Sequence, residues 1–505
     1  MDCGKVHLTL IRKTTLTTKR GWTDLYPWTI DRASDVPLFR QVYRQLRDTV
    51  TKGVLKPGSK LPSTRDLSLR LGVARMVVVT AFEQLMAESV IVGRRGSGSY
   101  VSSDLPPDVA FARAPGQRSR AGPQSMPVTL RDGFREHTAL HDDRPFATGR
   151  TLLDPRSAAV WRKLTQRAVR ALGPVDLGYA DPRGSAELRH AVSAYLESAR
   201  GVNADPDQII ITSGTQQAID LAIRVVLKRD DEAWVENPGY SLTAQALTAA
   251  GVILRPVAVD QHGIDVAAGV RAAAKARAAF VTPSHQFPTG VVMSMARRME
   301  LLAWAKSAGA WIIEDDYASE FRYSGKPLSS LQGLDTSGRV IYVGTLNKVL
   351  FPGLRLGYLV APAGLTEAMI EARYLMDRQP ASLTQAMVTA FMTEGHVITH
   401  LRRTRTAYAA QRDALAAALK RHGGDFFDVA VPDQGLHLVA YLKRHRSDIQ
   451  FEALARSKGV IVRAMSRLYL AGRPRQALML GFSGFPVETI GPAAAKLAKI
   501  ASMKL

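Results

Sequence analysis

Lys348 is the residue whose surroundings most directly suggest chemistry. It follows a strand-like segment at residues 340–343, and Arg355 comes seven residues later. Burial in apolar company lowers the pKa of an amine, and a neutral amine can condense with an aldehyde to form a Schiff base. Arg355 can return to the same pocket and clamp a phosphate with the fork of its guanidinium. The alternative for both residues is an ordinary surface pair of cations.

A carboxylate and a phenol follow a predicted buried strand at residues 310–314. Parallel sheets bind ligands at the carboxyl ends of their strands, which is where Asp315 lies. A carboxylate there can pair with a protonated pyridine nitrogen and so make the ring an electron sink. Tyr317, two residues later in an extended chain, can hydrogen-bond an oxygen on the same ring. An acidic loop without a ligand is the alternative.

Two more strand ends carry residues suited to a flat, phosphorylated molecule. Gly214 and Thr215 form a tight turn between a predicted strand and a helix, where backbone amides, a hydroxyl and the helix dipole make a phosphate cup. Tyr240 follows another strand and can stack on a flat ring. A lysine, a carboxylate, a phosphate cup, an arginine and an aromatic ring together fit pyridoxal 5′-phosphate.

The elements that must position these residues alternate from residue 146 to the end of the chain. This alternation predicts an α/β fold with a mostly parallel sheet. The strands are predicted at residues 208–212, 232–236, 278–282, 310–314 and 340–343, and two of the helices at 216–227 and 295–307.

The same motifs resemble those of the fold-type I aminotransferases. Residues 177–179, Asp181-Pro182 and Gly184 also resemble the entry motif of that family. The resemblance implies a smaller C-terminal α+β subdomain and a Schiff-base lysine at Lys348. It further implies that Asp315 contacts the pyridine nitrogen of the cofactor, Tyr317 its 3′-oxygen and Tyr240 the face of its ring. The residues implied around the phosphate are Gly214, Thr215, Thr345 and Arg355.

Two departures from that family concern the ligand. Phe287 stands where aminotransferases have the asparagine of Asn-Pro-x-Gly, which contacts the 3′-oxygen of the cofactor. We expect His285 or Gln286 to take over this contact. The alternative is that both belong to a polar loop beside the pocket. Met479 occupies the strand position of the arginine that binds the substrate carboxylate. We expect Arg467 to bind the acidic group of an effector instead, with Arg463 and Arg473 as alternatives, and each can equally be a surface arginine.

A separate small domain is predicted at residues 34–103. Leu38, Val42, Leu46 and Val50 recur at the spacing of a helix that ends near Gly53. A second helix begins after the capping residue Ser63, and a third spans residues 74–86 with Val77, Ala81 and Leu85 on its buried side. A two-stranded hairpin with a basic, glycine-rich turn follows. Together these elements form a winged helix-turn-helix.

The charge of the chain supports contact between this domain and DNA. The formal net charge is +22, and residues 1–145 hold 23 Lys and Arg against 14 Asp and Glu. Lys and Arg bind DNA because they displace counterions from phosphates. The expected contacts come from the two helices of the motif and from the wing: Ser63, Arg65, Arg75, Arg94, Arg95, Gly96 and Gly98. A solvated surface on a protein-binding domain is the alternative.

Residues 37–101 closely resemble the GntR-type winged helix-turn-helix, although Ala74, Met76 and Ser89 replace residues common in that family. A GntR-type head joined to an aminotransferase-like body resembles the MocR family of bacterial regulators. That resemblance implies a homodimeric, cytoplasmic transcriptional regulator that binds promoter DNA and senses an amino compound or pyridoxal phosphate. An active aminotransferase with an appended head, or a binding module that has lost its cofactor, are the other possibilities.

The remaining segments complete the expected domain organisation. Residues 1–33 are expected to form a basic extension, and residues 104–145, rich in Pro, Gly and Arg, a linker to the body at 146–505. The single cysteine excludes an intramolecular disulfide and any zinc cluster of several thiolates, and no metal site is expected. No apolar run is long enough to span a bilayer, and no signal peptide is evident.

Overall fold

The structure is a computed structural model that describes residues 28–94, 96–103, 144–325, 329–443 and 447–503. Two compact units divide the chain, residues 1–125 and residues 126–505. We call the first the head and the second the body, and each is described by itself. The extension before residue 28 and most of the expected linker, residues 104–143, lie outside the described residues.

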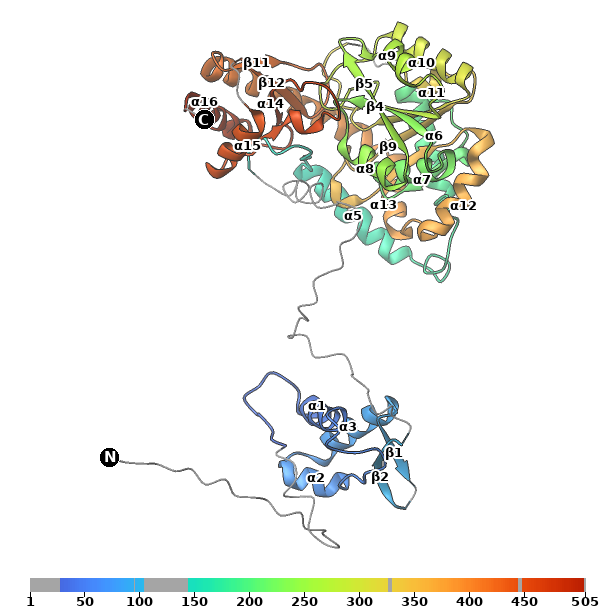
Figure 1. Ribbon diagram of the computed structural model, residues 1–505, viewed down its shortest axis with the longest axis vertical. Helices are drawn as coiled ribbons and strands as arrows, with labels where there is room; N and C mark the ends of the chain where they lie inside the picture. Colours follow the sequence, from blue (N-terminus) through green and yellow to red (C-terminus); the bar gives the residue numbers. More distant parts are fainter. Residues whose placement is uncertain (1–27, 95, 104–143, 326–328, 444–446, 504–505) are drawn as a thin grey trace, which may run out of the picture. The chain divides into compact units, whose positions relative to one another are not determined.

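The head is a bundle of three helices followed by a hairpin (Figure 1). Ser63 caps α2 as predicted, because its hydroxyl accepts a hydrogen bond from the Asp66 amide at 3.1 Å. On α3, Ala81 and Leu85 are buried as predicted, whereas Val77 is only partly buried, and Val78 and Phe82 complete the buried side. The elements are α1 Leu38–Thr51, α2 Thr64–Leu71, α3 Arg75–Ala87, β1 Ile91–Arg94 and β2 Gly98–Val101, with β1 and β2 antiparallel.

The head also includes residues that precede the predicted boundary. Trp28 donates its indole hydrogen to Thr49 Oγ1 at 3.0 Å, and the Asp31 amide donates to Gln41 Oε1 at 2.9 Å. Trp28 and Ile30 pack against the core of the head. Residues 28–33, which the sequence analysis placed in the extension, therefore bind along α1.

The body is built on an eight-stranded sheet with the strand order β3-β10-β9-β8-β7-β4-β5-β6. The five strands from β9 to β5 are parallel, whereas β10 and β6 run antiparallel to their neighbours. All five predicted strands are present. The strands are β3 Ile209–Thr212, β4 Glu232–Asn237, β5 Ile253–Asp260, β6 Gly263–Ile264, β7 Ala278–Val281, β8 Trp311–Asp316, β9 Val340–Thr345 and β10 Gly357–Val360.

Helices cover both faces of this sheet, as Figure 1 shows. Apolar side chains of α7, α8 and α12 form a core with one face, and those of α9, α10 and α11 form a core with the other. The bounds of these helices are α7 Thr215–Val226, α8 Ser241–Ala249, α9 Val266–Ala273, α10 Met295–Ala308, α11 Leu331–Leu334 and α12 Thr366–Asp377. Both predicted helices, α7 and α10, are found.

A smaller C-terminal subdomain contains the second sheet of the body, in the order β11-β12-β14-β13. All its strand pairs are antiparallel, which confirms the expected α+β subdomain. Its strands are β11 Phe427–Ala430, β12 His437–Leu442, β13 Arg463–Ala464 and β14 Ala477–Gly481. The remaining helices of the body are α5 Pro155–Ala171, α6 Ala186–Arg200, α13 Ser382–Thr393, α14 His396–Gly423, α15 Asp448–Ser457 and α16 Val487–Ser502.

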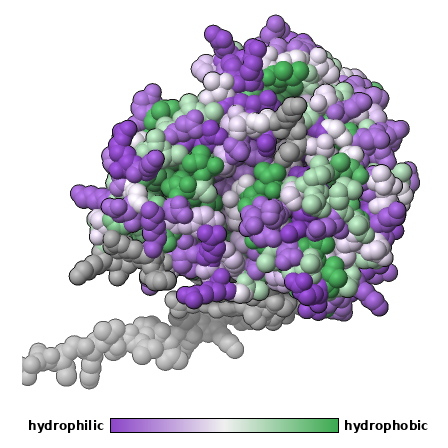
Figure 2. Space-filling model, turned by 90° about the horizontal axis from the view of Figure 1, so that it is seen from above, coloured by the Kyte–Doolittle hydropathy of each residue, from purple (hydrophilic) through white to green (hydrophobic). Residues whose placement is uncertain are grey.

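The surface mixes polar and apolar side chains. On the face shown in Figure 2, hydrophobic patches are separated by hydrophilic residues. Within the described residues, none of the helices combines the length and hydropathy that crossing a membrane requires.

Candidate functional site

The predicted lysine and carboxylate come from neighbouring strands. β8 and β9 pair in parallel, with Asp315 directly opposite Val343. The chain leaves β9 at Thr345 and reaches Lys348 three residues later, so the lysine starts from the edge of the sheet at which Asp315 lies. Strand β10 then returns antiparallel, which places Gly357 beside Thr345.

The charges of Lys348 and Asp315 act on each other. Burial raises the pKa of Asp315 to about 8, Asp316 and Glu236 add to this rise, and Lys348 opposes it. Burial lowers the pKa of the Lys348 amine, the charge of Arg463 lowers it further, and Asp315 opposes this. The two side chains are therefore close enough for their charges to interact.

A glycine leaves room for the amine. Gly149 has a φ of +81°, and a Cβ atom added to it would lie 2.8 Å from Lys348 Nζ. The chain around it is held at the end of β14, because the Gly481 amide donates to the Phe146 carbonyl at 2.9 Å. The backbone that leads into the body thus passes directly beside the lysine.

Unpaired polar atoms mark the space around Asp315. Within the described structure, Asp315 Oδ1 and the Tyr317 hydroxyl are buried without a hydrogen-bond partner, and so are both ring nitrogens of His285. Buried polar groups without a partner cost free energy and are rare. Their concentration beside a lysine with a lowered pKa indicates a place for a ligand.

The residues predicted to form a phosphate cup lie around the start of α7. Gly214 precedes α7 with a φ of 125°, and α7 has no side-chain cap, so its first amides stay available. A Cβ atom at Gly214 would lie 2.6 Å from Asn347 Nδ2 and 3.8 Å from a terminal nitrogen of Arg355. The glycine, Thr215 and the exposed Arg355 thus converge on one turn, with Thr345 buried at the end of β9 beside it. Sequence reasoning missed Asn347.

Tyr240 lies at the start of α8, where its ring meets Phe287 edge to face at a centroid distance of 5.6 Å. Burial raises the pKa of Tyr240 to about 12, with Asp315 adding to the rise and the cations Arg463 and Arg355 opposing it. The predicted stacking residue therefore lies among the groups it was expected to join.

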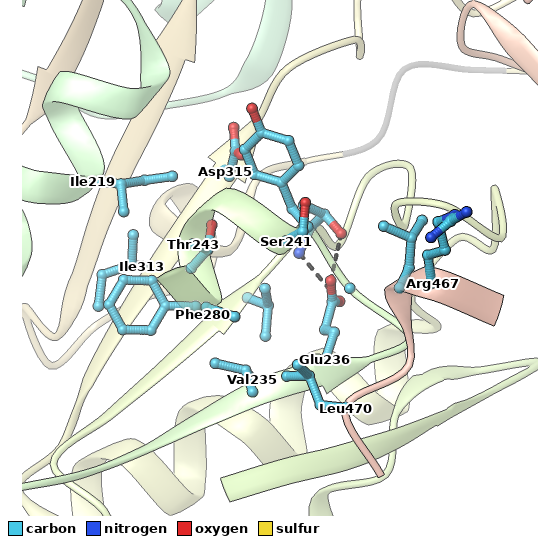
Figure 3. A pocket seen from close by; sticks show the side chains of 16 residues that line it. Ile219, Val235, Glu236, Ser241, Thr243, Phe280, Ile313, Asp315, Arg467 and Leu470 are labelled. Carbon is cyan, nitrogen blue, oxygen red and sulfur yellow. Dashed lines mark hydrogen bonds between the residues drawn. The ribbon is translucent and has the colours of Figure 1, made fainter. Parts of the chain in front are cut away.

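A pocket opens beside Asp315 and Tyr240 (Figure 3). Its lining includes Tyr240, Asp315, Glu236 and Arg467, and Lys348 is not part of it. Glu236, which sequence reasoning missed, accepts a hydrogen bond from Thr282 Oγ1 at 2.6 Å, and burial raises its pKa to about 7. Only the structure shows this second buried carboxyl beside Asp315.

The structure distinguishes the two residues proposed to replace the missing asparagine. The Gln286 amide donates to Pro238 O at 2.9 Å, and its oxygen accepts from the Thr289 hydroxyl at 2.6 Å. The His285 ring, by contrast, lies 6.0 Å from the Tyr317 ring, and burial lowers its pKa to about 3. Gln286 thus holds the loop in place, whereas His285 keeps both nitrogens unpaired.

The three candidate arginines for an effector differ in position. Arg467 is at the edge of the pocket, away from Asp315 in Figure 3; it is 42% exposed, and its Nε lies 3.0 Å from Glu452 Oε2. Arg473 is exposed. Of the three, Arg463 on β13 is the one whose charge lowers the pKa of Lys348. The role predicted for Arg467 remains a prediction.

The head presents its predicted DNA contacts on its surface. Arg65 in the first turn of α2 and Arg75 at the start of α3 are both exposed, and Arg75 Nε donates to Thr64 Oγ1 at 3.3 Å. The exposed glycines Gly96 and Gly98 adopt positive φ angles of 75° and 107° in the wing turn. Arg95 lies outside the described residues.

Sequence reasoning missed two residues at the wing, Tyr100 on β2 and Lys60, which pairs with Tyr100 as an isolated bridge. The Arg94 guanidinium lies 4.7 Å from the centroid of the Tyr100 ring, and Lys60 Nζ lies 5.9 Å from it. The Tyr100 hydroxyl is 2.6 Å from Ser97 Oγ. Both cations, one on the hairpin and one beside it, therefore lie near the Tyr100 ring, an arrangement suited to a phosphate backbone.

Among the residues that the structure describes, no three or more His, Cys, Asp or Glu side chains are placed to hold a metal ion.

Comparison with known families identifies both units. Residues 146–485 match the family described as aminotransferase class I and II, and residues 38–101 match the bacterial regulatory proteins of the gntR family. The two matches define a transcriptional regulator in which a GntR-type head is joined to an aminotransferase-like body. The chain belongs to the MocR-type family of such regulators, as its resemblance indicated.

Curated relatives share this organisation over nearly their whole length. The chain is 36% identical over 464 residues to the probable rhizopine catabolism regulatory protein MocR of Rhizobium meliloti, covering 91% of this chain and 93% of the relative. It is 30% identical over 452 residues to the pyridoxine biosynthesis regulator PdxR of Corynebacterium glutamicum, covering 89% of this chain and 93% of the relative.

Solved structures place the body among aminotransferases. An archaeal alanine:glyoxylate aminotransferase matches with a TM-score of 0.68 and 28% identity, over 74% of this chain and 96% of that one. A kynurenine aminotransferase of Pyrococcus horikoshii matches with a TM-score of 0.67 and 26% identity, over 73% of this chain and 94% of that one. This fold implies a site for pyridoxal phosphate.

Proposed function

We propose that the body of this regulator holds pyridoxal 5′-phosphate covalently on Lys348 and uses it to sense an amino compound. The observation that carries the proposal is geometric: Lys348 follows the end of β9, which pairs in parallel with the strand that carries the buried Asp315, and Asp315 Oδ1 has no hydrogen-bond partner. When bound, the cofactor supplies an aldehyde that the amine of an effector can take over from the lysine.

The residues around Lys348 and Asp315 fit such a group. Asp315 Oδ1 is unpaired, and its raised pKa means that the ionised form needs a cationic partner, which a protonated pyridine nitrogen provides. The unpaired Tyr317 hydroxyl and His285 ring are left to bond the ring oxygen. Tyr240 supplies an aromatic face on which the ring can stack.

The phosphate is assigned to the start of α7. Gly214 leaves no side chain in the turn, and the uncapped amides, the Thr215 hydroxyl and the nearby Arg355 offer donors of the kind that bind phosphate. Thr345, buried at the end of β9, adds a hydroxyl to the same region. These residues would hold the phosphate end of the group.

The head binds double-stranded promoter DNA in this proposal. Arg75 starts the helix that enters the major groove in helix-turn-helix proteins, and Arg94 lies on the wing. A change in how the body is occupied then changes DNA binding, because a ligand shifts a protein towards the state that it binds best. Pyridoxine biosynthesis in the name of one relative favours the cofactor itself as a signal, and the reactivity of an aldehyde towards amines favours an amino compound.

A homodimer is part of the same proposal. Val175, Leu177 and Tyr179 are 88%, 76% and 82% exposed. Their loop lies against the end of α12, since Gln379 Nε2 donates to Gly178 O at 3.3 Å, and Leu375 of α12 is 77% exposed. Neighbouring large apolar side chains with this exposure are typical of a surface covered by another protein, for which we propose a second copy of the chain.

The test is the variant Lys348→Ala, with Lys306→Ala on the exposed side of α10 as its control. The purified protein should absorb near about 420 nm, as a lysine-bound cofactor does. We expect Lys348→Ala to lose this absorbance completely and to stop responding to amines, while its DNA fragment stays bound.

Lys306→Ala should behave as the unmodified protein. Retention of the absorbance after Lys348→Ala, in protein denatured and freed of small molecules, would show that another residue carries the cofactor. Rapid conversion of amino acids to keto acids without retention of DNA would instead favour an enzyme as the main role.

A further inference from the structure

The segment by which the chain enters the body, residues 144–157, is attached to the C-terminal part of the body. Ser483, which follows β14, donates from its hydroxyl to Arg150 O at 2.6 Å. The Leu152 amide donates to the hydroxyl of Tyr408 on α14, also at 2.6 Å. We call residues 144–157 the lead-in segment. It is a fixed part of the body, and in the sequence it is the part that comes first after the head.

The lead-in segment lies against the amine of Lys348. A Cβ atom added to Gly149 would lie 2.8 Å from Lys348 Nζ, so the backbone at Gly149 and the amine leave no room for a further methyl group between them. A change that moves this amine, or puts another group in its place, therefore changes what the backbone at Gly149 contacts. This is a first direct contact between the segment and the proposed cofactor lysine.

A second contact runs through His400 on α14 to the residue after the lysine. His400 is fully buried, and its Nε2 lies 2.9 Å from Val349 O, while its Nδ1 lies 2.8 Å from Ser157 Oγ. A carbonyl oxygen only accepts hydrogen bonds, so Nε2 carries the hydrogen, and in the neutral ring Nδ1 accepts from the Ser157 hydroxyl. Burial lowers the pKa of His400, which favours the neutral ring. The imidazole thus joins the lead-in segment to the backbone that carries Lys348.

Ser157 has two possible acceptors for its hydroxyl hydrogen. Its Oγ lies 2.7 Å from Oδ2 of Asp154, the residue that caps α5, and 2.8 Å from His400 Nδ1. Arg403, one turn after His400 on α14, donates to Ser157 Oγ at 2.8 Å and to Asp154 Oδ2 at 3.2 Å. A hydroxyl has a single hydrogen, so Ser157 can donate to the carboxylate or to the imidazole, but not to both at once. Rotation of one hydroxyl therefore makes or breaks the link between α5 and His400.

We propose that the lead-in segment carries the state of the cofactor site to the chain that leads to the head, and that His400 is a positioning residue for this coupling. The inference rests on the proposed function and concerns how that function is regulated. A change at the Lys348 amine alters the contact with Gly149 directly, and a shift of the backbone at Val349 reaches Ser157 through His400. A ligand shifts a protein between two states only through contacts that differ between them, and these are two such contacts.

The experiment compares Ser157→Ala, His400→Leu and the double variant, each in the full chain. The matched controls are Ser198→Ala and His190→Leu, at exposed positions of α6 whose side chains bond to a carbonyl of the same helix. The dissociation constant for the promoter fragment of its own gene is measured in three states: without cofactor, with pyridoxal 5′-phosphate, and with pyridoxal 5′-phosphate plus excess n-propylamine. The ratio of the largest to the smallest of the three constants measures the coupling.

We expect a ratio of at least about fivefold in the unmodified protein, as is typical of coupled sites. Ser157→Ala should lower this ratio at least about twofold, which is what the loss of one hydrogen bond implies, and His400→Leu should lower it at least as much. The double variant should lower it no further than His400→Leu alone, because both changes remove the same link. Both controls should keep the ratio.

A second readout separates this role from a merely structural one. Ser157→Ala should keep the cofactor absorbance near about 420 nm and the DNA affinity of the cofactor-free protein, because neither the cofactor site nor the head is changed. A general loss of structure would lower both. Ser157→Ala alone decides the outcome if His400→Leu does not fold.

Three results would overturn the inference: a ratio near one in the unmodified protein, an unchanged ratio in Ser157→Ala, or effects of the two single changes that simply add in the double variant. In each case an intact absorbance near about 420 nm shows that the cofactor is still held on the lysine. Absence of that absorbance from the unmodified protein would instead reject the proposed function itself, and this inference with it.

Discussion

The head and the body are both proposed to bind phosphate, but they present their charges in opposite ways. In the head, Arg65, Arg75 and Arg94 are exposed, so they stay solvated until a polyanion arrives. In the body, Asp315, Glu236 and Lys348 have pKa values shifted mainly by burial. The head needs no ligand to satisfy its charged groups, whereas the body holds unpaired polar atoms that a ligand would satisfy.

Because of this difference, DNA binding by the head and ligand binding by the body gain their free energy from different sources. Exposed cations gain affinity from the counterions that DNA releases, which makes the affinity sensitive to salt. A preorganised, buried site pays the cost of desolvation during folding and recovers it when a ligand of matching charge is bound. The body is therefore expected to be sensitive to cofactor and pH, and the head to ionic strength.

The largest expected effect is on the exposed cations of the head. The double variant Arg65→Ala/Arg75→Ala should lose about 2–6 kcal/mol of DNA affinity, at least about thirtyfold, if each side chain contributes about 1–3 kcal/mol. Fluorescence anisotropy with the promoter fragment of its own gene measures this loss, and the salt dependence should become shallower. The cofactor absorbance should stay the same.

The matched control removes two exposed arginines from the body, Arg271→Ala/Arg421→Ala, without changing the total loss of charge. An equal loss of affinity in head and body variants would mean that overall charge, not the face of the helix-turn-helix, attracts DNA. The exposed arginines of the head would then not be a specific site for DNA.

A smaller effect is expected at the phosphate cup of the body. Gly214→Ala places a Cβ atom 2.6 Å from Asn347 Nδ2 and forces alanine into a φ of 125°. Such strain costs about 1–3 kcal/mol, so the dissociation constant for pyridoxal phosphate should rise about 5–150-fold. Equilibrium titration of cofactor-free protein, followed by absorbance, gives that constant.

Gly364→Ala is the control, because nothing lies within 4 Å of a Cβ atom added there. If both variants bound the cofactor equally well, the turn before α7 would not be the phosphate site. The proposal for Lys348 and Asp315 would remain to be judged by its own test.

Local motifs explain how much of this molecule could be predicted from its sequence. The cap at Ser63, the strands β8 and β9 and the placement of Lys348 after β9, next to the strand that carries Asp315, depend on short segments or on neighbouring parallel strands. Hydrophobic runs bounded by Gly and Pro define such segments, so the mostly parallel sheet and the site at its edge follow. The fold class and the family were predicted correctly for this reason.

The errors concern side-chain direction and polar segments. Val77 and Val78 differ by one helical position, and hydrophobicity alone does not distinguish them. Residues 28–33 bind α1 through hydrogen bonds to amide side chains such as that of Gln41. Because these contacts are polar, the segment has no regular spacing of apolar residues from which its binding could be predicted.

The smallest effect we predict is the pH dependence of stability in the cofactor-free protein. The folded-state pKa of Asp315, about 8, lies above the value of about 3.9 typical of an unfolded chain. The fold thus favours the protonated carboxyl, and this contribution is complete below about pH 4 and is lost as the pH rises through about 8. The amide side chain in the variant Asp315→Asn cannot ionise, so that variant avoids this loss.

Urea unfolding at pH 6.0, 6.5 and 7.0 tests this expectation in cofactor-free protein. The free energy of unfolding of Asp315→Asn should rise relative to that of the unmodified protein as the pH rises, by about 1 kcal/mol over this range, because the unfolded chain binds about one proton fewer there and one proton over one pH unit is worth about 1.4 kcal/mol. Asp425→Asn, at an exposed position, should show no such trend. A constant difference would mean that the Asp315 carboxyl ionises freely in the folded body. The contrast with the solvated charges of the head would then not hold, because a carboxyl that ionises freely needs no cationic ring beside it.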